Sequence, residues 1–574
     1  MSFIQFNSSD RIFKNDLNKN DENRQFSHSM PVAIQTEAVI NKGKIELRLK
    51  FNQARFDSEK ANYLLSAWER YIEKSCDINR LIVSTSSEAS FGRVGEIVPY
   101  TYTQLDYWFM YMQTGDSWDL NLAYLLEGDV NVSILKKAII DNVKKHDIFW
   151  TDISRKRPYR KRVMPRNFEV NVYDWRETSI GELANKVNKE NVPKAIDLNK
   201  PPLINVSVIR FEGNRYVLAY RVSHILFDYT SSQVFLTQIL ERYESLLTQE
   251  NPSPLEIENP VLEMAYKERR DFETGKFEKD LNYWKKHLNN VKHYELPRGL
   301  EGRPGTEKIA FPKGAISQFK KICEDRGISL QMGFLALLGK ALFDFNQKND
   351  IVIKIIINER SQWKKKNSIG PILREVPIYF RYEEEDTFET LGKKVQSSVL
   401  NAVEHRHLPW IIPLSILEKN RWPKIYKPLF KASDWVSQKL AQMAFPKAEL
   451  YPKILSNYVS FLEVPKFSWS KVNSEEMEVS LNMVLQQDDN LIENKPNHPS
   501  IKASLLNSVG SETSVDASVG TWQDKGLNFT VFSQEGTELL ILNSNKMSHT
   551  LRTELLEKAL ELFNKEIREY KMHQ

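Results

Sequence analysis

The sequence predicts a mixed α/β fold divided into at least two domains or lobes. A chain of 574 residues exceeds what one hydrophobic core usually supports. The run 216–222 has the alternation of a β-strand, whereas apolar residues in 234–246 recur at helical spacing. A strand–turn–helix pattern also occurs near each end of the chain, at 44–72 and at 537–563. These observations favour strands and helices that follow one another along the chain.

The N-terminal part predicts a loosely attached segment followed by a small β–α unit. Residues 1–35 are rich in Asn, Asp, Lys and Ser, which is typical of disorder. The alternating run 44–51 predicts a strand, and spaced apolar residues over 61–72 predict an amphipathic helix. Because this pattern repeats at 537–563, we interpret residues 36–76 as the tail of a second, otherwise missing copy of the main domain. The alternative is an unrelated β–α unit.

A boundary is predicted at residues 77–98, where the Ser- and Thr-rich run 84–92 is typical of a linker. The main body then begins at Pro99. We divide it into a first lobe, 99–295, and a second lobe, 296–574.

The stretch 223–231 joins a predicted strand to a predicted helix, and Thr230 and Ser231 occupy the expected N-cap. Side chains alternate along a strand, so His224 shares a face with Val222, while Ser223 points to the other face. Ser223 and His224 therefore cannot form a nucleophile pair. His224 would act on a bound substrate, or else it is a core histidine beside a capping Asp228.

Composition and charge exclude several classes of protein. The net charge of +5 is small for this length, so no nucleic-acid binding is expected. The two cysteines, Cys76 and Cys323, fit neither a metal nor a redox spacing, which agrees with a reducing cytoplasm. His405 and His407 have no third ligand nearby, so no metal site is expected. We find no signal peptide and no apolar run long enough for a membrane span, and expect a cytoplasmic monomer.

A series of motifs from Pro99 to Phe563 resembles, in order, the landmarks of condensation domains of nonribosomal peptide synthetases. The matching segments are Pro99–Gln104 with Trp108-Phe109, Leu126–Val130 with Lys145-His146-Asp147, Ser223–Ser231, Asp280–Trp284, Glu359-Arg360 with Ile369-Gly370-Pro371 and Val376–Ile378, His407–Trp410, and Lys427–Phe430.

This resemblance implies a two-lobed fold like that of chloramphenicol acetyltransferase, with a tunnel between the lobes. It implies that His224 is catalytic and that the motif around it, Ser223, Asp228, Tyr229 and Ser231, is structural. It also suggests residues that line the tunnel or its floor: His146, Trp150, Arg360 and Gly370. Substrates would arrive on the phosphopantetheine arms of acyl or peptidyl carrier proteins, or of neighbouring synthetase modules, and no cofactor would be bound.

The chain departs from the family motifs at several positions. Ser223 replaces the first His of the His-His-x-x-x-Asp-Gly motif and Tyr229 replaces its Gly, so Tyr229 could narrow the channel. Trp150 replaces an Arg, so Asp228 is expected to lose an ion-pair partner. Asp106 and Arg374 replace an Arg and an Asn. The pattern from Ser223 to Ser231 also resembles terminal condensation-like domains that release or cyclise peptides.

The densest basic run, 155–162, has two interpretations. Arg155, Arg157, Arg160 and Arg162 could dock an acidic carrier protein. Alternatively, the run is a solvated hairpin loop. Residues 486–499 and 508–520 are predicted to be insertion loops.

Three functions remain open on the sequence. The first is acyl transfer that forms an amide between a carrier-bound thioester and an amine. The second is release, cyclisation or ester formation. The third is a degenerate domain that only docks carrier proteins or tailoring enzymes, in which case Tyr229 and Trp150 would plug the tunnel.

Overall fold

The computed structural model describes residues 34–41, 44–51, 95–115, 117–155, 159–213, 215–248, 260–292, 294–295, 305–360, 367–420, 476–485, 501–505, 526–534, 537–544 and 547–573. The chain divides into two compact units, residues 1–90 and 91–574. The cut between them falls inside the range predicted as a linker.

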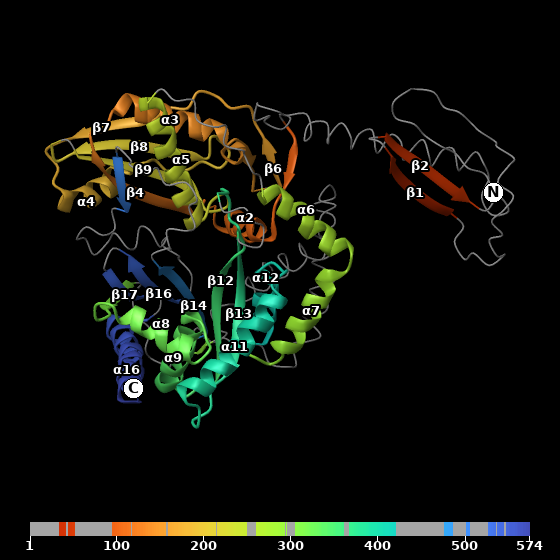
Figure 1. Cartoon of the computed structure of the whole chain (residues 1–574), viewed down its shortest axis with the longest axis vertical. Coiled ribbons are helices and arrows are strands. Elements are labelled where there is room, and N and C mark those ends of the chain that lie inside the picture. The colour runs from red at the N-terminus through yellow and green to blue at the C-terminus, as the bar shows by residue number, and fades with distance from the viewer. Residues whose placement is uncertain are drawn as a thin grey trace. The chain divides into compact units, whose positions relative to one another are not determined.

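The described part of the first unit is a two-stranded hairpin (Figure 1). Strand β1 (Ile34–Asn41) pairs antiparallel with β2 (Lys44–Phe51). The predicted strand at 44–51 is confirmed, whereas β1 was not predicted because the run of Ala38, Val39 and Ile40 hides any alternation. The disorder expected for 1–35, apart from residues 34–35 in β1, and the helix expected at 61–72 lie outside the described residues. The origin of 36–76 stays a prediction.

The second unit contains a five-stranded sheet, which we call the first sheet. Its order is β15-β4-β9-β8-β7, and only β7 and β8 run parallel. Its strands are β4 (Asp119–Gly128), β7 (Asn171–Trp175), β8 (Ile204–Phe211), β9 (Arg215–Ser223) and β15 (Ile501–Leu505). The helices of this half are α2 (Tyr102–Thr114), α3 (Val132–Lys145), α4 (Ile180–Glu190), α5 (Tyr229–Thr248), α6 (Pro260–Glu273) and α7 (Lys276–His287), with a 3-10 turn, η1 (Asp147–Phe149).

The two faces of the first sheet bury different side chains, as the alternation along β9 predicts. Leu218, Tyr220 and Val222 belong to the main core, which also contains Phe235 of α5. Val217 and Ala219 instead join a smaller cluster with residues of α4. The predicted face of His224 is therefore the face covered by α5 (Figure 1). The same part of the chain also forms a small three-stranded sheet, with the order β3 (Ile97–Pro99), β6 (Tyr159–Arg162) and β5 (Thr151–Ile153).

The second sheet has the order β11-β17-β16-β14-β12-β13, with β10 paired to β14. Its strands are β10 (Tyr294–Glu295), β11 (Gly305–Ala310), β12 (Asp350–Asn358), β13 (Leu373–Arg381), β14 (Glu476–Leu485), β16 (Gly526–Gln534) and β17 (Thr537–Ser544). The helices of this half are α8 (Ala315–Asp325), α9 (Leu330–Asn346), α11 (Phe388–Glu404), α12 (Ile411–Asn420) and α16 (His549–His573). Helix α9 contacts α8, α11 and α16.

Two strands cross the division predicted at residue 295. Strand β15 lies in the predicted second lobe but pairs with β4 of the first sheet, from Ile501↔Gly128 to Leu505↔Tyr124. Strand β10 lies at the end of the predicted first lobe but pairs with β14. The boundary at 295/296 is therefore wrong for these two segments, because backbone pairing joins strands that are far apart in sequence. The predicted insertion loops at 486–499 and 508–520 lie outside the described residues.

Among the described residues, no single helix has the length and apolar composition to cross a membrane. Within the described part of the chain, α8 and α9 meet those criteria of length and composition when taken together, and they are bent by 98°. Most residues of α9 are buried in the core of this half.

Candidate functional site

His224 is the first residue after β9; its backbone is held by one hydrogen bond, and its ring by a second hydrogen bond and one aromatic ring. Its backbone N–H donates to the carbonyl of Trp118 at 2.8 Å. Its Nδ1 lies 2.7 Å from the carbonyl oxygen of Phe227. The ring of Tyr107, from α2, stacks on the imidazole with centroids 4.5 Å apart and an interplanar angle of 24°. The side chain is therefore fixed in position and in plane.

The contact with Phe227 determines the tautomer of His224. A carbonyl oxygen can only accept, so Nδ1 carries the proton and Nε2 carries the lone pair in the neutral ring. His224 is only 9% exposed. Burial lowers the pKa of His224 from its ordinary value, and the Asp228 carboxylate opposes only part of this effect. The imidazole is thus prepared to accept a proton at neutral pH.

Asp228 is the centre of a buried network that joins the two halves of the unit. Both of its carboxylate oxygens accept from Arg360, at 2.7 Å each, and Ile372 N–H donates to Oδ2 at 3.1 Å. Burial alone raises the pKa of Asp228, but the Arg360 ion pair and the Ser231 hydrogen bonds bring it below its ordinary value. Asp228 is therefore an ionised structural residue.

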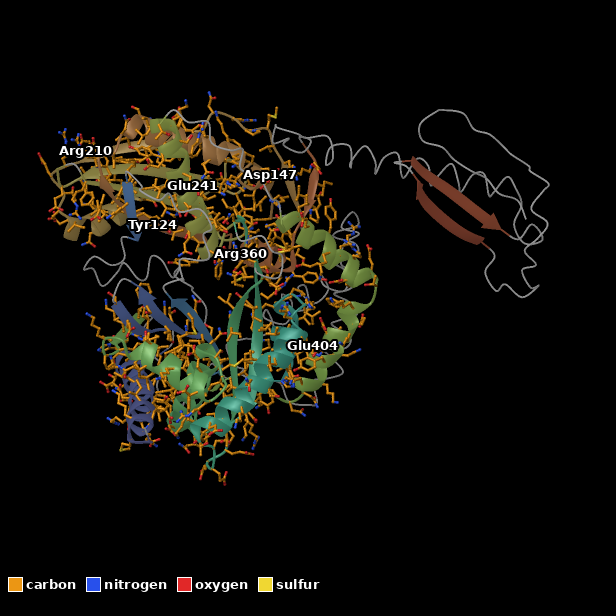
Figure 2. The ribbon with its side chains drawn as sticks, in the orientation of Figure 1. Tyr124, Asp147, Arg210, Glu241, Arg360 and Glu404 are labelled. Carbon is orange, nitrogen blue, oxygen red and sulfur yellow. The ribbon has the colours of Figure 1, made fainter. Side chains whose placement is uncertain are left out.

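This network corrects two predictions. Asp228 does not lack an ion-pair partner: Arg360 takes that role, although the two residues are 132 positions apart. Arg360, labelled in Figure 2, was expected to line the tunnel or its floor, but it is 4% exposed and its guanidinium bonds to Asp228, Ser231 and backbone carbonyls. A bidentate Arg–carboxylate pair binds more strongly than a single hydrogen bond, which explains how it orders this loop.

Ser231 and Gly370 complete the network. Asp228 Oδ1 accepts from the Ser231 N–H at 2.8 Å, which makes Asp228 the N-cap of α5, so the predicted cap at Thr230 or Ser231 is wrong. Gly370 N–H donates to Ser231 Oγ at 2.9 Å. Gly370 has φ +149°, and a Cβ there would lie 2.1 Å from a methyl group of Val261, so the close approach requires glycine.

The other motif residues lie where the alternation placed them or deeper. Ser223 Oγ donates to the Ser117 carbonyl at 2.6 Å, away from the imidazole, as predicted. Trp150 is 1% exposed, and its indole N–H donates to the Val143 carbonyl, so it does not line an open channel. His146 Nε2 donates to the Gln238 side-chain oxygen at 2.7 Å, and burial lowers the pKa of His146 to about 4. Tyr229 is the half-buried first residue of α5.

The described end of the basic run, Tyr159–Arg162, is strand β6, and its arginines do not form one exposed surface. Arg160 is 2% exposed, and Arg162 is buried with ion pairs to Asp147 at 3.2 Å and Glu96 at 3.4 Å. Both the docking interpretation and the solvated-loop interpretation are therefore wrong for these two residues, because alternate residues of β6 face inward. Arg155 is exposed and bonds to the Met112 carbonyl, and Arg157 lies outside the described residues.

Three important side chains were not predicted as part of the site. Tyr107 stacks on His224, as described above. Asp106 accepts from the N–H groups of Trp410 and Ile411 and so caps α12. Arg374 forms a buried ion pair with Glu268 of α6. The only sequence signals were the positions of Asp106 and Arg374 as departures from the family motifs, and nothing distinguished Tyr107 from other core aromatics.

In the described residues, no group of three or more His, Cys, Asp or Glu side chains is placed to hold a metal ion. The site described above consists of one positioned imidazole in a buried, hydrogen-bonded loop.

Residues 94–432 match the protein-family model described as Condensation domain. Enniatin synthase of Fusarium equiseti is 24% identical over 338 residues, which are 57% of this chain and 11% of that protein. Chondramide synthase of Chondromyces crocatus is 23% identical over 334 residues, which are 55% of this chain and 8% of that protein. The chain thus matches only a small part of these relatives.

Solved structures share the fold at low sequence identity. The X-domain from teicoplanin biosynthesis has a TM-score of 0.60 at 16% identity and covers 84% of this chain and 97% of its own. The same X-domain in a complex with OxyB has a TM-score of 0.59 at 15% identity. The match covers 84% of this chain and 96% of that chain. The first condensation domain of the calcium-dependent antibiotic synthetase, solved with a substrate analogue, has a TM-score of 0.58 at 12% identity. The match covers 82% of this chain and 96% of that chain. These matches confirm the predicted two-lobed fold.

Proposed function

The chain belongs to the Condensation domain family, and on that basis we propose that it forms an amide bond between an acyl or peptidyl thioester and an amine. The thioester would be held on the phosphopantetheine arm of a carrier protein or a neighbouring module. The observation that carries the proposal is the geometry of His224, whose Nδ1 is engaged by the Phe227 carbonyl so that Nε2 bears the lone pair.

The reaction asks little of the protein beyond placement and one proton acceptor. The amine nitrogen attacks the thioester carbonyl, and the C–N bond forms as the C–S bond breaks. Nε2 of His224 accepts a proton from the attacking nitrogen, and the departing pantetheine sulfur is protonated to give the free thiol. Asp228 is a positioning residue here, because its carboxylate is engaged by Arg360, Ser231 and Ile372.

Amide formation can be tested with small thioesters in place of loaded carrier proteins. The donor is an N-acetylaminoacyl-pantetheine thioester, which has no free amine, and the acceptor is an aminoacyl-pantetheine, each varied over a panel of side chains. Mass spectrometry detects the amide. We expect His224→Ala to reduce turnover by about 10²-fold or more, which is the usual contribution of a general base.

The matched control is Ser223→Ala, the adjacent substitution. Ser223 faces Ser117, so we expect turnover within about twofold of the wild type and a loss of about 1 kcal/mol in stability from one hydrogen bond. Turnover that survives His224→Ala unchanged would rule out the catalytic role. The same panel includes hydroxyacyl acceptors and peptidyl thioesters, so ester formation or cyclisation would appear as a different product.

A second candidate is docking without catalysis. It is supported by the fold match to the X-domain that was solved in complex with OxyB, and by the replacement of the motif glycine by Tyr229. If the wild type forms no product with any panel member, yet binds a phosphopantetheine-loaded carrier protein in calorimetry, this candidate replaces the first.

A further inference from the structure

Helix α2 is bonded to the loop that carries His224 and also to the other half of the unit. The Gln104 side-chain N–H donates to the carbonyl of Ile225, the residue after His224, at 2.9 Å. The Thr103 hydroxyl donates to the carbonyl of Leu373 in β13 at 2.6 Å. Asp106 caps α12 through the N–H groups of Trp410 and Ile411. Helix α2 is therefore a fixed support rather than a loosely packed helix.

The start of α2 is also fixed internally. Thr101 accepts from the Gln104 N–H at 3.2 Å, and the Gln104 side-chain oxygen accepts from the Thr101 N–H at the same distance, which forms a capping box. Gln104 thus uses its oxygen for the cap and its N–H for the His224 loop. Tyr107 follows on this rigid helix and is 5% exposed.

The stack of Tyr107 on His224 restricts the tilt of the imidazole ring, which the hydrogen bond to the Phe227 carbonyl leaves free. One hydrogen bond at Nδ1 fixes an edge of the imidazole but allows the ring to tilt about that bond. The stacked Tyr107 ring, with its centroid 4.5 Å from that of the imidazole and an interplanar angle of 24°, restricts the tilt. Because the Nε2 lone pair lies in the ring plane, a tilt moves it away from a proton that it would accept. Small misplacements of a reacting group can cost about 10²-fold in rate.

We propose that Tyr107 is a positioning residue that sets the plane of the His224 imidazole, with α2 as its rigid support. The catalytic part of this inference rests on the proposed function, whereas the placement of the ring does not. The aromatic face is the relevant group, so phenylalanine should replace tyrosine and leucine should not.

The experiment compares Tyr107→Leu with Tyr107→Phe in the full chain. The matched control is Tyr111→Leu, since Tyr111 lies one turn later on α2, is similarly buried and is not the ring that stacks on His224. Selective isotope labelling of histidine gives imidazole resonances, and the His224 signal is identified by its loss in His224→Ala. Turnover is measured with the thioester panel described above.

We expect Tyr107→Leu to remove the ring-current shift of the His224 ring protons and to lower kcat by about 10-fold, within the range that misplacement allows, with KM within about twofold. Tyr107→Phe and Tyr111→Leu should keep both properties. If Tyr107→Leu does not fold, Tyr107→Met takes its place, because the flexible methionine side chain can fill the space left by the tyrosine ring without providing an aromatic face.

The outcomes separate the two proposals. An unchanged His224 resonance in the leucine or methionine variant overturns the role of Tyr107. A changed resonance with unchanged kcat, in an enzyme that His224→Ala inactivates, also overturns it. If the resonance changes as expected but His224→Ala leaves turnover unchanged, the proposed function fails, while Tyr107 still sets the ring plane.

Discussion

His224 combines a fixed tautomer with a depressed proton affinity. The Phe227 carbonyl selects the Nδ1–H form, and burial lowers the pKa below that of an exposed histidine. A base that must be neutral benefits from both effects, because it is deprotonated over a wider range of pH. Ser223, the adjacent residue, contributes a hydrogen bond on the opposite face of the strand.

The direction in which the pKa of His224 is shifted predicts how kcat depends on pH. A lowered pKa means that the neutral imidazole persists below pH 6.5, so the acid limb of kcat should have its midpoint below about 6.5, the ordinary value for histidine. The profile is measured with the thioester panel between pH 5 and 8. His146→Gln is the control, since His146 bonds to Gln238 and should leave the limb in place. A midpoint at or above pH 7 would contradict the assignment.

The free energy of unfolding, like kcat, should decrease as the pH falls below the ordinary pKa of histidine. The pKa of His146 is lowered to about 4 by burial, so the unfolded chain binds more protons than the folded chain between about pH 6.5 and 4. Stability therefore decreases as the pH falls through this window.

A buried ion pair between Asp228 and Arg360 joins two elements around the site. Asp228 caps the start of α5, and Arg360 follows β12 of the second sheet, so their contact joins an element of each half. Both residues belong to family motifs that can be read from the sequence, but those motifs do not indicate that the two residues pair. Pairing depends on how β12 and α5 approach each other, which no local pattern encodes.

Removing one partner of this pair should be costly. Arg360→Met leaves the Asp228 carboxylate buried without its cation, so we expect a loss of about 3–5 kcal/mol in the free energy of unfolding. Urea unfolding measures it. The double variant Asp228→Leu with Arg360→Met should recover part of the loss, because no buried charge remains, while the N–H groups of Ser231 and Ile372 still lose their acceptor.

The control for this prediction is an exposed pair of the same type. Arg381 and Asp350 lie 3.1 Å apart with side chains 58% and 46% exposed. Arg381→Met should change the free energy of unfolding by less than about 1 kcal/mol. Equal losses at the two sites would show that burial does not strengthen the Asp228–Arg360 pair.

At the scale of the whole unit, the halves exchange strands as well as side-chain contacts. Strand β15 comes late in the chain but forms the edge of the first sheet beside β4. The first sheet is therefore complete only when a segment from the second half of the chain reaches it. We expect the two halves to unfold together.

A single substitution in β15 tests this coupling. Ile501 is fully buried, so Ile501→Ala should cost about 2–5 kcal/mol, whereas Lys502→Ala, the exposed neighbour, should cost less than about 0.5 kcal/mol. Urea unfolding followed by both far-ultraviolet circular dichroism and tryptophan fluorescence should give one shared transition, shifted by Ile501→Ala. Two separate transitions, of which only one shifts, would show that the halves unfold independently.

The local features of the site could be predicted from the order of residues alone. The alternation along 216–222 predicted which core faces Val222 and which way Ser223 points, because side-chain direction in a strand depends only on neighbouring residues. The order of motifs from Pro99 onward predicted the two-lobed fold, which the matches to solved structures confirm. These properties are encoded within short segments.

The meeting of distant residues, in contrast, became visible only in three dimensions. In the structure, Asp228 pairs with Arg360, and Tyr107 stacks on His224. Arg160 and Arg162 are buried, and β15 pairs with β4 in the first sheet. Each outcome depends on contacts between segments far apart in the chain. A local pattern can report that such a residue is apolar or charged, but packing between elements selects its partner.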